Sequence, residues 1–498
     1  MFAGIDCGTQ GTKAVIMNPD GDILGVGYAP HKIIEDPSGK REQDPQWWVD
    51  ATIIAMRGAL EAAGVSGEAI LGLSVSGQQH GLVPLGSDGR VLRPAKLWND
   101  IETAPENADM IARFGGAAAY EKAIGLVPLT GYTLSKVLWL QKNEPETFEQ
   151  LGSMLLPHDY LNYWLTGRQV AEYGDASGTA YFDIRERKWS EEVLALIDGG
   201  TGHLAKCLPE LIEPDAIVDT LTSEAASALG LSTSCVVAAG GGDNMMGAIG
   251  TGNLSEGIVT LSIGTSAAAY SHSDTPVTDP KGRVAAFCSS DGAWLPLVCM
   301  MNAAEVSSMA ASLIGQDVRA INTALASCPP GANGLTVLPF LSGERTPDLP
   351  NATGSVLGIN KINFNPDNFL RAFTEGVTFG MLAGLKLILS GRSCQAIHLI
   401  GGGAKSSEWR QMIADATGAQ VLVPKSEEGG ALGAALQAQW AWLKQAGTPA
   451  PLADLAAKAV ALDPAKTADP IAERKGAYDV AFGRYRQAVL DTYQTDVL

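Results

Sequence analysis

Hydrophobic and polar positions recur with two different periods along the chain, and each period predicts one kind of element. The first residues, FAGID, are apolar and end on an acid, and a Gly/Thr turn joins them to a second apolar run, AVIMN. Runs of this length predict two strands. Asp44 and Pro45 then mark the start of a helix, whose apolar positions 49, 53, 56 and 60 are spaced by 4, 3 and 4 and share one face. The apolar run ILGLSVS predicts a further strand, and this alternation is typical of α/β layers.

The same order of elements returns in the second half of the chain. The segment GIVTLSIGTSAAAYS again contains an apolar strand, a Gly-Thr-Ser turn and a second apolar strand, and AIHLI later leads into GGGAKSS and another amphipathic helix. Each half therefore begins with a hairpin around a turn of small residues, which predicts two structurally similar domains. The join falls in the glycine-rich residues 240–257, so we place the domains at residues 1–247 and 248–498.

Length, charge and cysteine content narrow the classes of partner. The 498 residues exceed the roughly 250–300 that one core supports, which agrees with two domains. A net charge of -19 argues against nucleic acid and anionic membrane surfaces, because both need a basic footprint. We find no signal-type segment and no apolar run of membrane length, and the 7 cysteines form no C-x-x-C pair. A cytoplasmic protein without nucleic-acid or membrane partners is therefore expected.

Two Gly-Thr turns have the features of a phosphate site. Asp6 ends the first strand, and the turn after it offers backbone N–H groups, hydroxyls and a lysine to phosphate oxygens, while Asp6 can hold Mg²⁺ directly or through water. The candidate ligands of this turn are Gly8, Thr9, Gln10, Thr12 and Lys13. The turn at Gly264 and Thr265 stands in the equivalent place of the second half, so we expect the two turns to bind one phosphate chain from opposite sides. An ordinary tight hairpin with a surface lysine is the alternative for the first turn.

A candidate base follows a later strand. In GGGDN, three glycines turn the chain after the apolar run VVAA and place Asp243 and Asn244 at the C-terminal end of a strand, where α/β sheets bind ligands. A sugar hydroxyl has a pKa far above 7, so phosphoryl transfer to it needs a base, and Asp has that role in other kinases. The alternative is that Asp243 only caps a helix.

Residues 77–100 combine polar groups with an aromatic ring. Gln79 and His80 lie in the loop GQQHG, and Trp98 follows in WND. Sugars are bound by many hydrogen bonds together with one flat apolar face, which these residue types provide. A structural histidine and a core tryptophan are the alternatives. The glycine triplet 401–403 admits a flat ring or a phosphate against bare backbone, and a packing turn explains it equally well.

In this order the segments resemble the FGGY family of carbohydrate kinases. The resemblance extends from Gly4 to about Gly433 and includes GIDCGTQGTK, GYTLSKVLWLQKN, GGGDN, SIGTS and IGGGAKSSEWRQ. A second family signature fits less well around residues 354–375, where Phe373 is bulkier than the usual residue. The resemblance implies an α/β fold of two actin-like (ribonuclease H-like) ATPase domains with a catalytic cleft between them, with the sugar mostly on the first domain and ATP on the second.

The resemblance also implies a role for each candidate residue. Asp243 would be the general base and Asp6 would stand near Mg²⁺, so both are counted as catalytic. The residues implied for ATP are Gly8, Thr9, Gln10, Thr12, Lys13, Gly264, Thr265, Asn302, Gly402, Gly403, Ala404 and Ser407. The residues implied for the sugar are Gln79, His80, Trp98, Asp243 and Asn244. Ser407 replaces an Asn found there in some relatives.

The segments LPFLSGERTP, GQQHG and LRPAKLWND are similar to the subgroup of the family whose substrate is D-xylulose. The implied reaction is ATP-dependent phosphorylation of D-xylulose to D-xylulose 5-phosphate. Three alternatives stay open: a kinase for another ketose or a polyol, an actin- or Hsp70-like protein that uses ATP to change conformation, and a catalytically silent sugar-binding module. Homodimers are common in the family, so a homodimer is one assembly that the resemblance allows.

Overall fold

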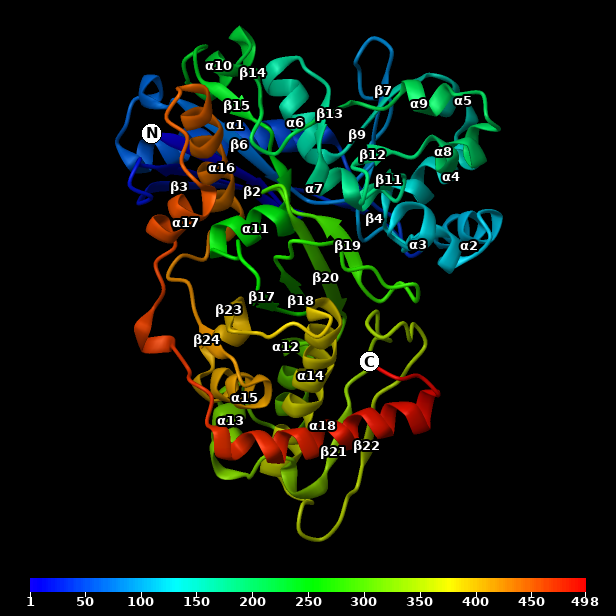
Figure 1. The fold of residues 1–498 in the computed structure, drawn as a ribbon, viewed down its shortest axis with the longest axis vertical. Coiled ribbons are helices and arrows are strands. Elements are labelled where there is room, and N and C mark those ends of the chain that lie inside the picture. The colour runs from blue at the N-terminus through cyan, green and yellow to red at the C-terminus, as the bar shows by residue number, and fades with distance from the viewer. The chain divides into compact units, whose positions relative to one another are not determined.

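The computed structural model describes residues 1–498 and contains two compact units (Figure 1). The first unit consists of Met1–Leu254, Ser273–Leu295 and Glu428–Val460, and the second of Ser255–His272, Pro296–Glu427 and Ala461–Leu498. The predicted domains, 1–247 and 248–498, differ from these units by assigning the segments 273–295 and 428–460 to the second half. Both units combine strands with helices, so the predicted α/β class is confirmed.

The first unit is built on a sheet of order β14-β15-β6-β1-β2-β3, with β16 also paired to β6. Its strands are β1 (Phe2–Cys7), β2 (Gly11–Met17), β3 (Ile23–Pro30), β6 (Gly72–Gly77), β14 (Ile217–Thr220), β15 (Val236–Ala238) and β16 (Gly241–Gly242). The hairpin of β1 and β2 sets Asp6 opposite Lys13, and the parallel neighbour β6 sets Ser76 beside Asp6. β16 runs parallel to β6 with Gly242 opposite Gly77. The ends of β1, β6 and β16 thus lie at one edge of the sheet.

Helices cover both faces of this sheet. The longer helices of the whole unit are α1 (Pro45–Ala63), α2 (Ala104–Arg113), α3 (Ala117–Ile124), α4 (Thr133–Asn143), α6 (Pro157–Thr166), α8 (Glu191–Asp198), α11 (Asp243–Thr251), α16 (Gly429–Gln445) and α17 (Leu452–Ala459), of which α1 and α16 pack on the sheet from opposite faces. The shorter elements are β4 (Ile34–Glu35), β5 (Arg41–Gln43), β7 (Val83–Gly86), β8 (Ala95–Lys96), β9 (Leu151–Leu155), β10 (Val170–Glu172), β11 (Phe182–Asp183), β12 (Lys188–Trp189), β13 (Glu210–Ile212), β19 (Ala285–Cys288), α5 (Pro145–Glu149), α7 (Tyr173–Ala176), α9 (His203–Lys206) and α10 (Ser223–Leu229).

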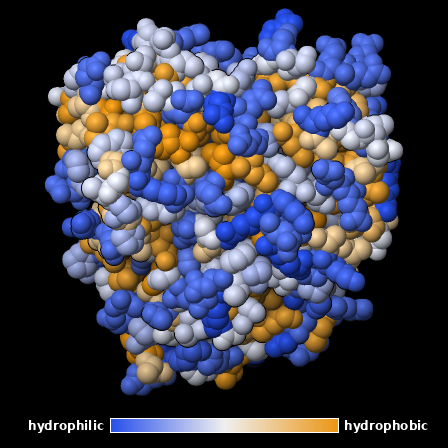
Figure 2. All heavy atoms as spheres, turned by 45° about the horizontal axis from the view of Figure 1, so that its top comes forward, coloured by the Kyte–Doolittle hydropathy of each residue, from blue (hydrophilic) through white to orange (hydrophobic).

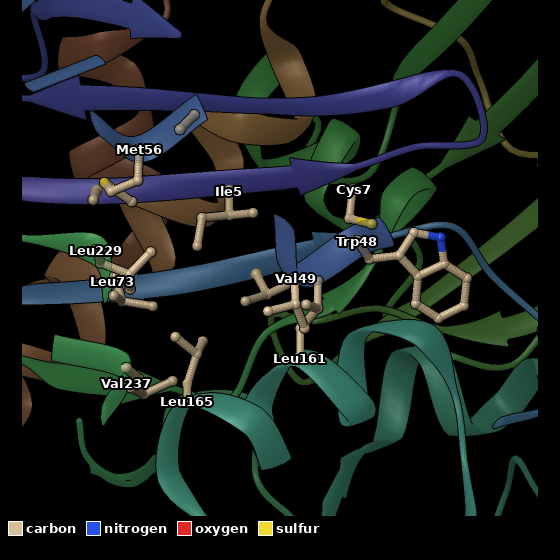
Figure 3. Close-up of a cluster of buried hydrophobic side chains, with 14 of the residues drawn as sticks. Ile5, Cys7, Trp48, Val49, Met56, Leu73, Leu161, Leu165, Leu229 and Val237 are labelled. Carbon is tan, nitrogen blue, oxygen red and sulfur yellow. The ribbon is translucent and has the colours of Figure 1, made fainter. Parts of the chain in front are cut away.

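Alternate residues of β2 face two separate cores. Ala14 and Ile16 belong to a cluster with α1, whereas Val15 and Met17 pack with α16, as the two-residue period of a strand requires. Figure 3 shows part of the first cluster, where Trp48, Val49 and Met56 of α1 lie near Ile5, Leu73 and Val237 of the sheet. The predicted start of α1 is confirmed, because Asp44 accepts a hydrogen bond from the N–H of Gln46 and Pro45 opens the helix.

Within the second unit the strands follow the order β20-β18-β17-β23-β24 in their sheet, which repeats this topology. Its strands are β17 (Ile258–Ile263), β18 (Ala267–Ser271), β20 (Trp294–Met300), β21 (Thr336–Leu338), β22 (Ser355–Leu357), β23 (Ala396–Ile400) and β24 (Gln420–Leu422), and its helices are α12 (Ala304–Leu313), α13 (Arg319–Ser327), α14 (Pro366–Leu389), α15 (Ser407–Thr417) and α18 (Ala472–Tyr493). An antiparallel hairpin, β17–β18, again has a parallel strand beside its first member. The order matches β3-β2-β1-β6-β15, so the predicted structural repeat is confirmed.

Helix α14 differs from one expectation. By length and composition alone it could cross a membrane, whereas the hydrophobic pattern predicts no segment of that kind. Of its most apolar window, 78% is buried inside the protein, which is the pattern of a core helix. Hydrophilic residues lie among the hydrophobic ones over the face drawn in Figure 2.

Candidate active site

Asp6 stands at the end of β1 with its carboxylate enclosed by neighbouring elements of the first unit. Its Oδ1 accepts a hydrogen bond of 2.7 Å from Ser76 Oγ. A Cβ atom at Gly430, in the first turn of α16, would lie 2.7 Å from Asp6 Cγ, so only glycine leaves space there. Burial raises the pKa of Asp6, while the Ser76 hydrogen bond and the charge of Lys13 lower it. Lys13 is itself paired with Glu428 at 2.8 Å.

The two threonines of the first turn have different surroundings. Thr12 is fully buried, and its hydroxyl lies 2.9 Å from Nε2 of His31, whose Nδ1 lies 3.0 Å from the carbonyl oxygen of Gly8. Burial lowers the pKa of His31 to about 4, so the ring is neutral at pH 7. Since a carbonyl only accepts, Nδ1 carries the ring proton and Thr12 donates to Nε2. The Thr12 hydroxyl thus supports the turn, and its contact with ATP stays a prediction.

Thr9 and Gln10 complete the turn. Thr9 Oγ1 lies 3.0 Å from Gln78 Oε1 and 2.9 Å from the indole nitrogen of Trp98. The Gly8 N–H donates to the carbonyl of Gly11 at 3.0 Å, which closes the turn, and Gln10 is exposed at its tip. The structure therefore brings together the first phosphate turn and the predicted aromatic wall of the sugar pocket.

The predicted base and two predicted sugar contacts also meet. Asn244 donates through Nδ2 to Gln79 Oε1 at 2.8 Å and to Asp243 Oδ1 at 3.0 Å. Gln79 is buried, and a Cβ atom at Gly242 would lie 2.8 Å from its Cγ, so the glycine turn and the loop at 77–81 pack closely. The amides of Gln79 and Asn244 thus form one polar cluster with the carboxylate of Asp243.

Asp243 is the first residue of α11, and Gly242 occupies the N-cap position. The structure thus places Asp243 one residue after the N-cap, and its role as a base stays a prediction. Burial raises the pKa of Asp243 to about 7, and the charges of Asp6 and Asp175 add to the effect, while the N–H of Asn244, 2.8 Å from Oδ1, opposes it. A carboxylate with such a pKa can take a proton near neutral pH.

His80 adopts a left-handed backbone conformation, with φ of 66°. Its ring centroid lies 4.5 Å from that of Tyr132 and 5.5 Å from that of Phe287. Its carbonyl oxygen accepts a hydrogen bond of 2.8 Å from Nζ of Lys136, which is fully buried and also donates to the carbonyls of Gly131 and Tyr132. Burial lowers the pKa of Lys136 to about 7. Lys136 was missed as a site residue; its signal was a lysine within the apolar run TLSKVLWL.

The sequence pattern also did not identify a group of buried acidic residues near this cluster. His158 lies 2.6 Å from Asp175 through Nδ1 and 3.3 Å from Asp159 through Nε2. Glu172 accepts hydrogen bonds from the Gly174 N–H and from Ser290. Burial raises the pKa of Asp159 and Glu172 to about 7 and that of Asp175 well above its usual range. Of this group, Asp175 is close enough for its charge to contribute to the raised pKa of Asp243.

The second unit holds the remaining candidates around the end of β17. Gly264 and the exposed Thr265 form the turn into β18, and the Gly264 N–H donates to the carbonyl of Ser266 at 2.9 Å. The glycine triplet packs on the residue just before this turn, since a Cβ atom at Gly401 would lie 2.6 Å from the carbonyl oxygen of Ile263. Two predicted ATP segments are thus neighbours within this unit.

The other second-unit candidates flank these turns. Gly403 and Ala404 are buried after the exposed Gly402, and Ser407 is exposed at the start of α15. The cap of that helix is Ser406, which accepts from the N–H of Trp409. Asn302 is buried and donates to Gly343 O at 2.6 Å and Glu344 Oε2 at 2.9 Å. Its amide is thus engaged with the segment 343–344, and its contact with ATP stays a prediction.

Known proteins match the chain over most of its length. Residues 1–250 match the N-terminal domain of the FGGY family of carbohydrate kinases, and residues 259–442 match the C-terminal domain. The xylulose kinase of Haemophilus influenzae is 45% identical over 447 residues, covering 89% of this chain and 90% of that protein. The xylulose kinase of Streptomyces rubiginosus is 36% identical over 441 residues, covering 88% and 87%. The structure of xylulose kinase from Bifidobacterium adolescentis superposes with a TM-score of 0.84 at 31% identity, covering 96% of this chain and 99% of that one.

Proposed function

The chain belongs to the FGGY family of carbohydrate kinases, and we propose that it transfers the γ-phosphoryl group of ATP to a hydroxyl of D-xylulose, giving D-xylulose 5-phosphate. The identity to proteins named xylulose kinase over most of the chain supports this substrate. The observation that carries the proposal is the cluster of Asp243, Asn244 and Gln79, in which a carboxylate with a pKa of about 7 stands among amide groups suited to sugar hydroxyls.

Asp243 is proposed as the general base. The attacking sugar hydroxyl loses its proton as its oxygen bonds to the γ-phosphorus, while the bond from that phosphorus to the leaving oxygen of ADP breaks. A base whose pKa lies near the working pH combines a useful deprotonated fraction with a useful driving force for proton transfer. General-base catalysis of this kind contributes roughly 10²–10⁴-fold. Gln79, His80, Trp98 and Asn244 are proposed to hold the sugar against this carboxylate.

Asp6 is proposed to hold Mg²⁺, which serves with ATP. The residues present fit the ion, because Asp6 offers carboxylate oxygens, the ligands that Mg²⁺ prefers. The negative charge of Asp6 also raises the pKa of Asp243, and a nearby cation would reduce this charge repulsion. Bound there, Mg²⁺ would supply neutralisation of phosphate charge. Lys13 would add a cation, and backbone N–H groups of the turn at 8–12 would add donors for the phosphate oxygens.

The remaining ATP contacts are proposed on the second unit. The residues concerned are Gly264, Thr265, Asn302, Gly402, Gly403, Ala404 and Ser407. The adjacency of the two glycine turns at the end of β17 supports their joint use, since bare backbone accommodates phosphate or a flat ring. We accordingly assign sugar binding to residues 1–247 and adenosine binding to residues 248–498.

Location and assembly complete the proposal. All the cysteines are free, and ATP is the co-substrate, so we place the enzyme in the reducing cytoplasm. We expect no nucleic-acid or membrane partner. A homodimer is the assembly we propose, and light scattering of the purified protein checks it.

The decisive experiment measures ATP consumption with D-xylulose, D-ribulose and glycerol, for the wild type, Asp243→Asn and the exposed control Asp219→Asn. We expect the highest kcat/KM with D-xylulose, a loss of at least about 100-fold in kcat for Asp243→Asn, and no loss for the control. A higher kcat/KM with another sugar would identify that sugar as the substrate in place of D-xylulose. Sugar-independent ATP turnover alone would favour an actin- or Hsp70-like role, and near wild-type activity of Asp243→Asn would end the assignment of the base.

A further inference from the structure

One hydroxyl in the first unit joins the phosphate turn to two of the three segments that carry proposed sugar contacts, the loop at 77–81 and the segment of Trp98. Thr9 Oγ1 lies 2.9 Å from Nε1 of Trp98 and 3.0 Å from Oε1 of Gln78. Trp98 follows β8, and Gln78 directly precedes Gln79 and His80 in the loop after β6. Thr9 thus lies where a displacement of either sugar-binding segment would reach the phosphate turn.

The direction of each hydrogen bond around Thr9 follows from the fixed groups nearby. Nε2 of Gln43 lies 2.8 Å from the backbone carbonyls of both Thr9 and Lys32, which only accept, so this end of the amide carries the protons. Its oxygen therefore faces the indole N–H of Trp48 and Nε2 of Gln78, each at 2.9 Å. The Gln78 amide is fixed in turn, and its oxygen points at Thr9.

The same reasoning assigns the proton of the Thr9 hydroxyl. The indole N–H of Trp98 can only donate, so Thr9 accepts from it. Thr9 then gives its single proton to the oxygen of Gln78. Gln78 is buried, whereas 39% of the Trp98 surface is exposed, so a ligand can reach the indole but not the amide. Both the indole N–H and the hydroxyl proton are used inside the unit, and the ring face is what Trp98 has left to offer a sugar.

We propose that Trp98 is a positioning residue that acts through Thr9: its indole N–H locks the Thr9 hydroxyl onto Gln78 and so holds the phosphate turn in register with the sugar loop. This inference rests on the proposed function. A sugar packed against the indole face would stabilise the donor that orders the turn, so that phosphoryl transfer becomes efficient when the sugar is present. Without the lock, the turn is set less accurately for transfer to the sugar hydroxyl.

The test compares Trp98→Phe, which keeps an aromatic face and removes the N–H, with Thr9→Val, which removes the hydroxyl at nearly constant shape, and with the double variant. D-xylulose and ATP are the probes in steady-state kinetics on the full chain. Trp98→Phe should lower kcat about 3- to 10-fold, the range of one hydrogen bond of ordinary net strength, with KM for D-xylulose changed less than about twofold. The double variant should be no slower than Thr9→Val alone, because both changes break one link.

Two further variants serve as controls. Trp164→Phe changes a half-buried indole of α6 that packs on the core, and it should leave kcat unchanged. Thr9→Ser keeps the hydroxyl and should lose less activity than Thr9→Val. This comparison tests the hydrogen bond between Trp98 and Thr9 by changing Thr9, so it remains available if Trp98→Phe fails to fold.

Three outcomes would overturn the inference. Losses of Trp98→Phe and Thr9→Val that multiply in the double variant would mean that the two act independently. A raised KM with unchanged kcat in Trp98→Phe would mean that the N–H serves the sugar directly. A wild-type chain that consumes no ATP with D-xylulose would remove the proposed function and this inference together, whereas multiplying losses in an active enzyme would remove the inference alone.

Discussion

Adjacent glycines at the start of α16 allow a matched test of how accurately Asp6 must be placed. A Cβ atom at Gly430 would lie 2.7 Å from Asp6 Cγ and 2.8 Å from both carboxylate oxygens. At Gly429 the nearest atom to an added Cβ is Thr251 Cγ2 at 3.7 Å, an ordinary contact. Gly430→Ala and Gly429→Ala therefore add the same methyl group to the same helical turn, and only the first displaces the carboxylate.

The expected magnitudes separate the two variants. Alanine favours the helix over glycine by about 0.5–1 kcal/mol, so Gly429→Ala should leave stability unchanged or raise it by that amount. In Gly430→Ala the Asp6 carboxylate must retreat by about 0.7 Å to reach an ordinary contact of 3.4 Å, which strains its 2.7 Å hydrogen bond from Ser76. A hydrogen bond to a charged group is worth about 1.5–3 kcal/mol, which offsets the helical gain. Misplacing a catalytic group by 1 Å can cost about 100-fold in rate, so we expect a loss of kcat of about 10- to 100-fold.

The assay is steady-state turnover of ATP and D-xylulose, with thermal unfolding measured on the same samples. Reduced kcat in Gly430→Ala, at a Tm within a few degrees of the wild type and with Gly429→Ala fully active, is the expected result. Equal activity of the two variants would show that Asp6 can move without consequence, and the argument from its enclosure would then be refuted.

Three further predictions follow from buried charges. Asp243 must be deprotonated to act as a base, so kcat/KM should rise with pH through about 7; a pH–rate profile that stays flat through this pH would contradict the assignment of the base. Arg371→Met leaves Glu375 buried without the partner at 2.8 Å and should cost about 3–5 kcal/mol in denaturant unfolding, whereas a cost near zero would show that the carboxyl is satisfied by other groups. Lys136→Met removes the donor that holds the sugar loop and should raise KM for D-xylulose about 3- to 10-fold, and a change confined to kcat would count against this role.

Much of the fold could be predicted because its signals are local. A strand, a small-residue turn and a second strand follow one another within twenty residues. Asp44 starts α1 by accepting from the nearby N–H of Gln46, and Pro45 has no N–H that needs a partner. The repetition of this order at β17 and β18 was visible for the same reason. Local rules also explain why Asp243 was placed at a strand end, although the pattern alone did not show that Gly242, rather than Asp243, is the cap.

The groups that tune the site were missed because they become neighbours only in the folded chain. Ser290 reaches Glu172 across 118 positions, and no periodicity of hydrophobic residues encodes such a contact. Helix α16 shows the same limit: the sequence analysis assigns its residues to the second domain, 248–498, whereas α16 packs on the first sheet and supplies the glycine beside Asp6. The spacing of hydrophobic residues shows which of them share a face of a helix or strand, but it does not show which element packs on that face. The packing depends on glycines, which leave space for a carboxylate or a helix backbone at less than 3 Å from where a Cβ atom would stand. The chemistry of this site therefore depends on glycines, which have no side chain. A pattern of hydrophobic and polar residues carries the least information at glycine positions.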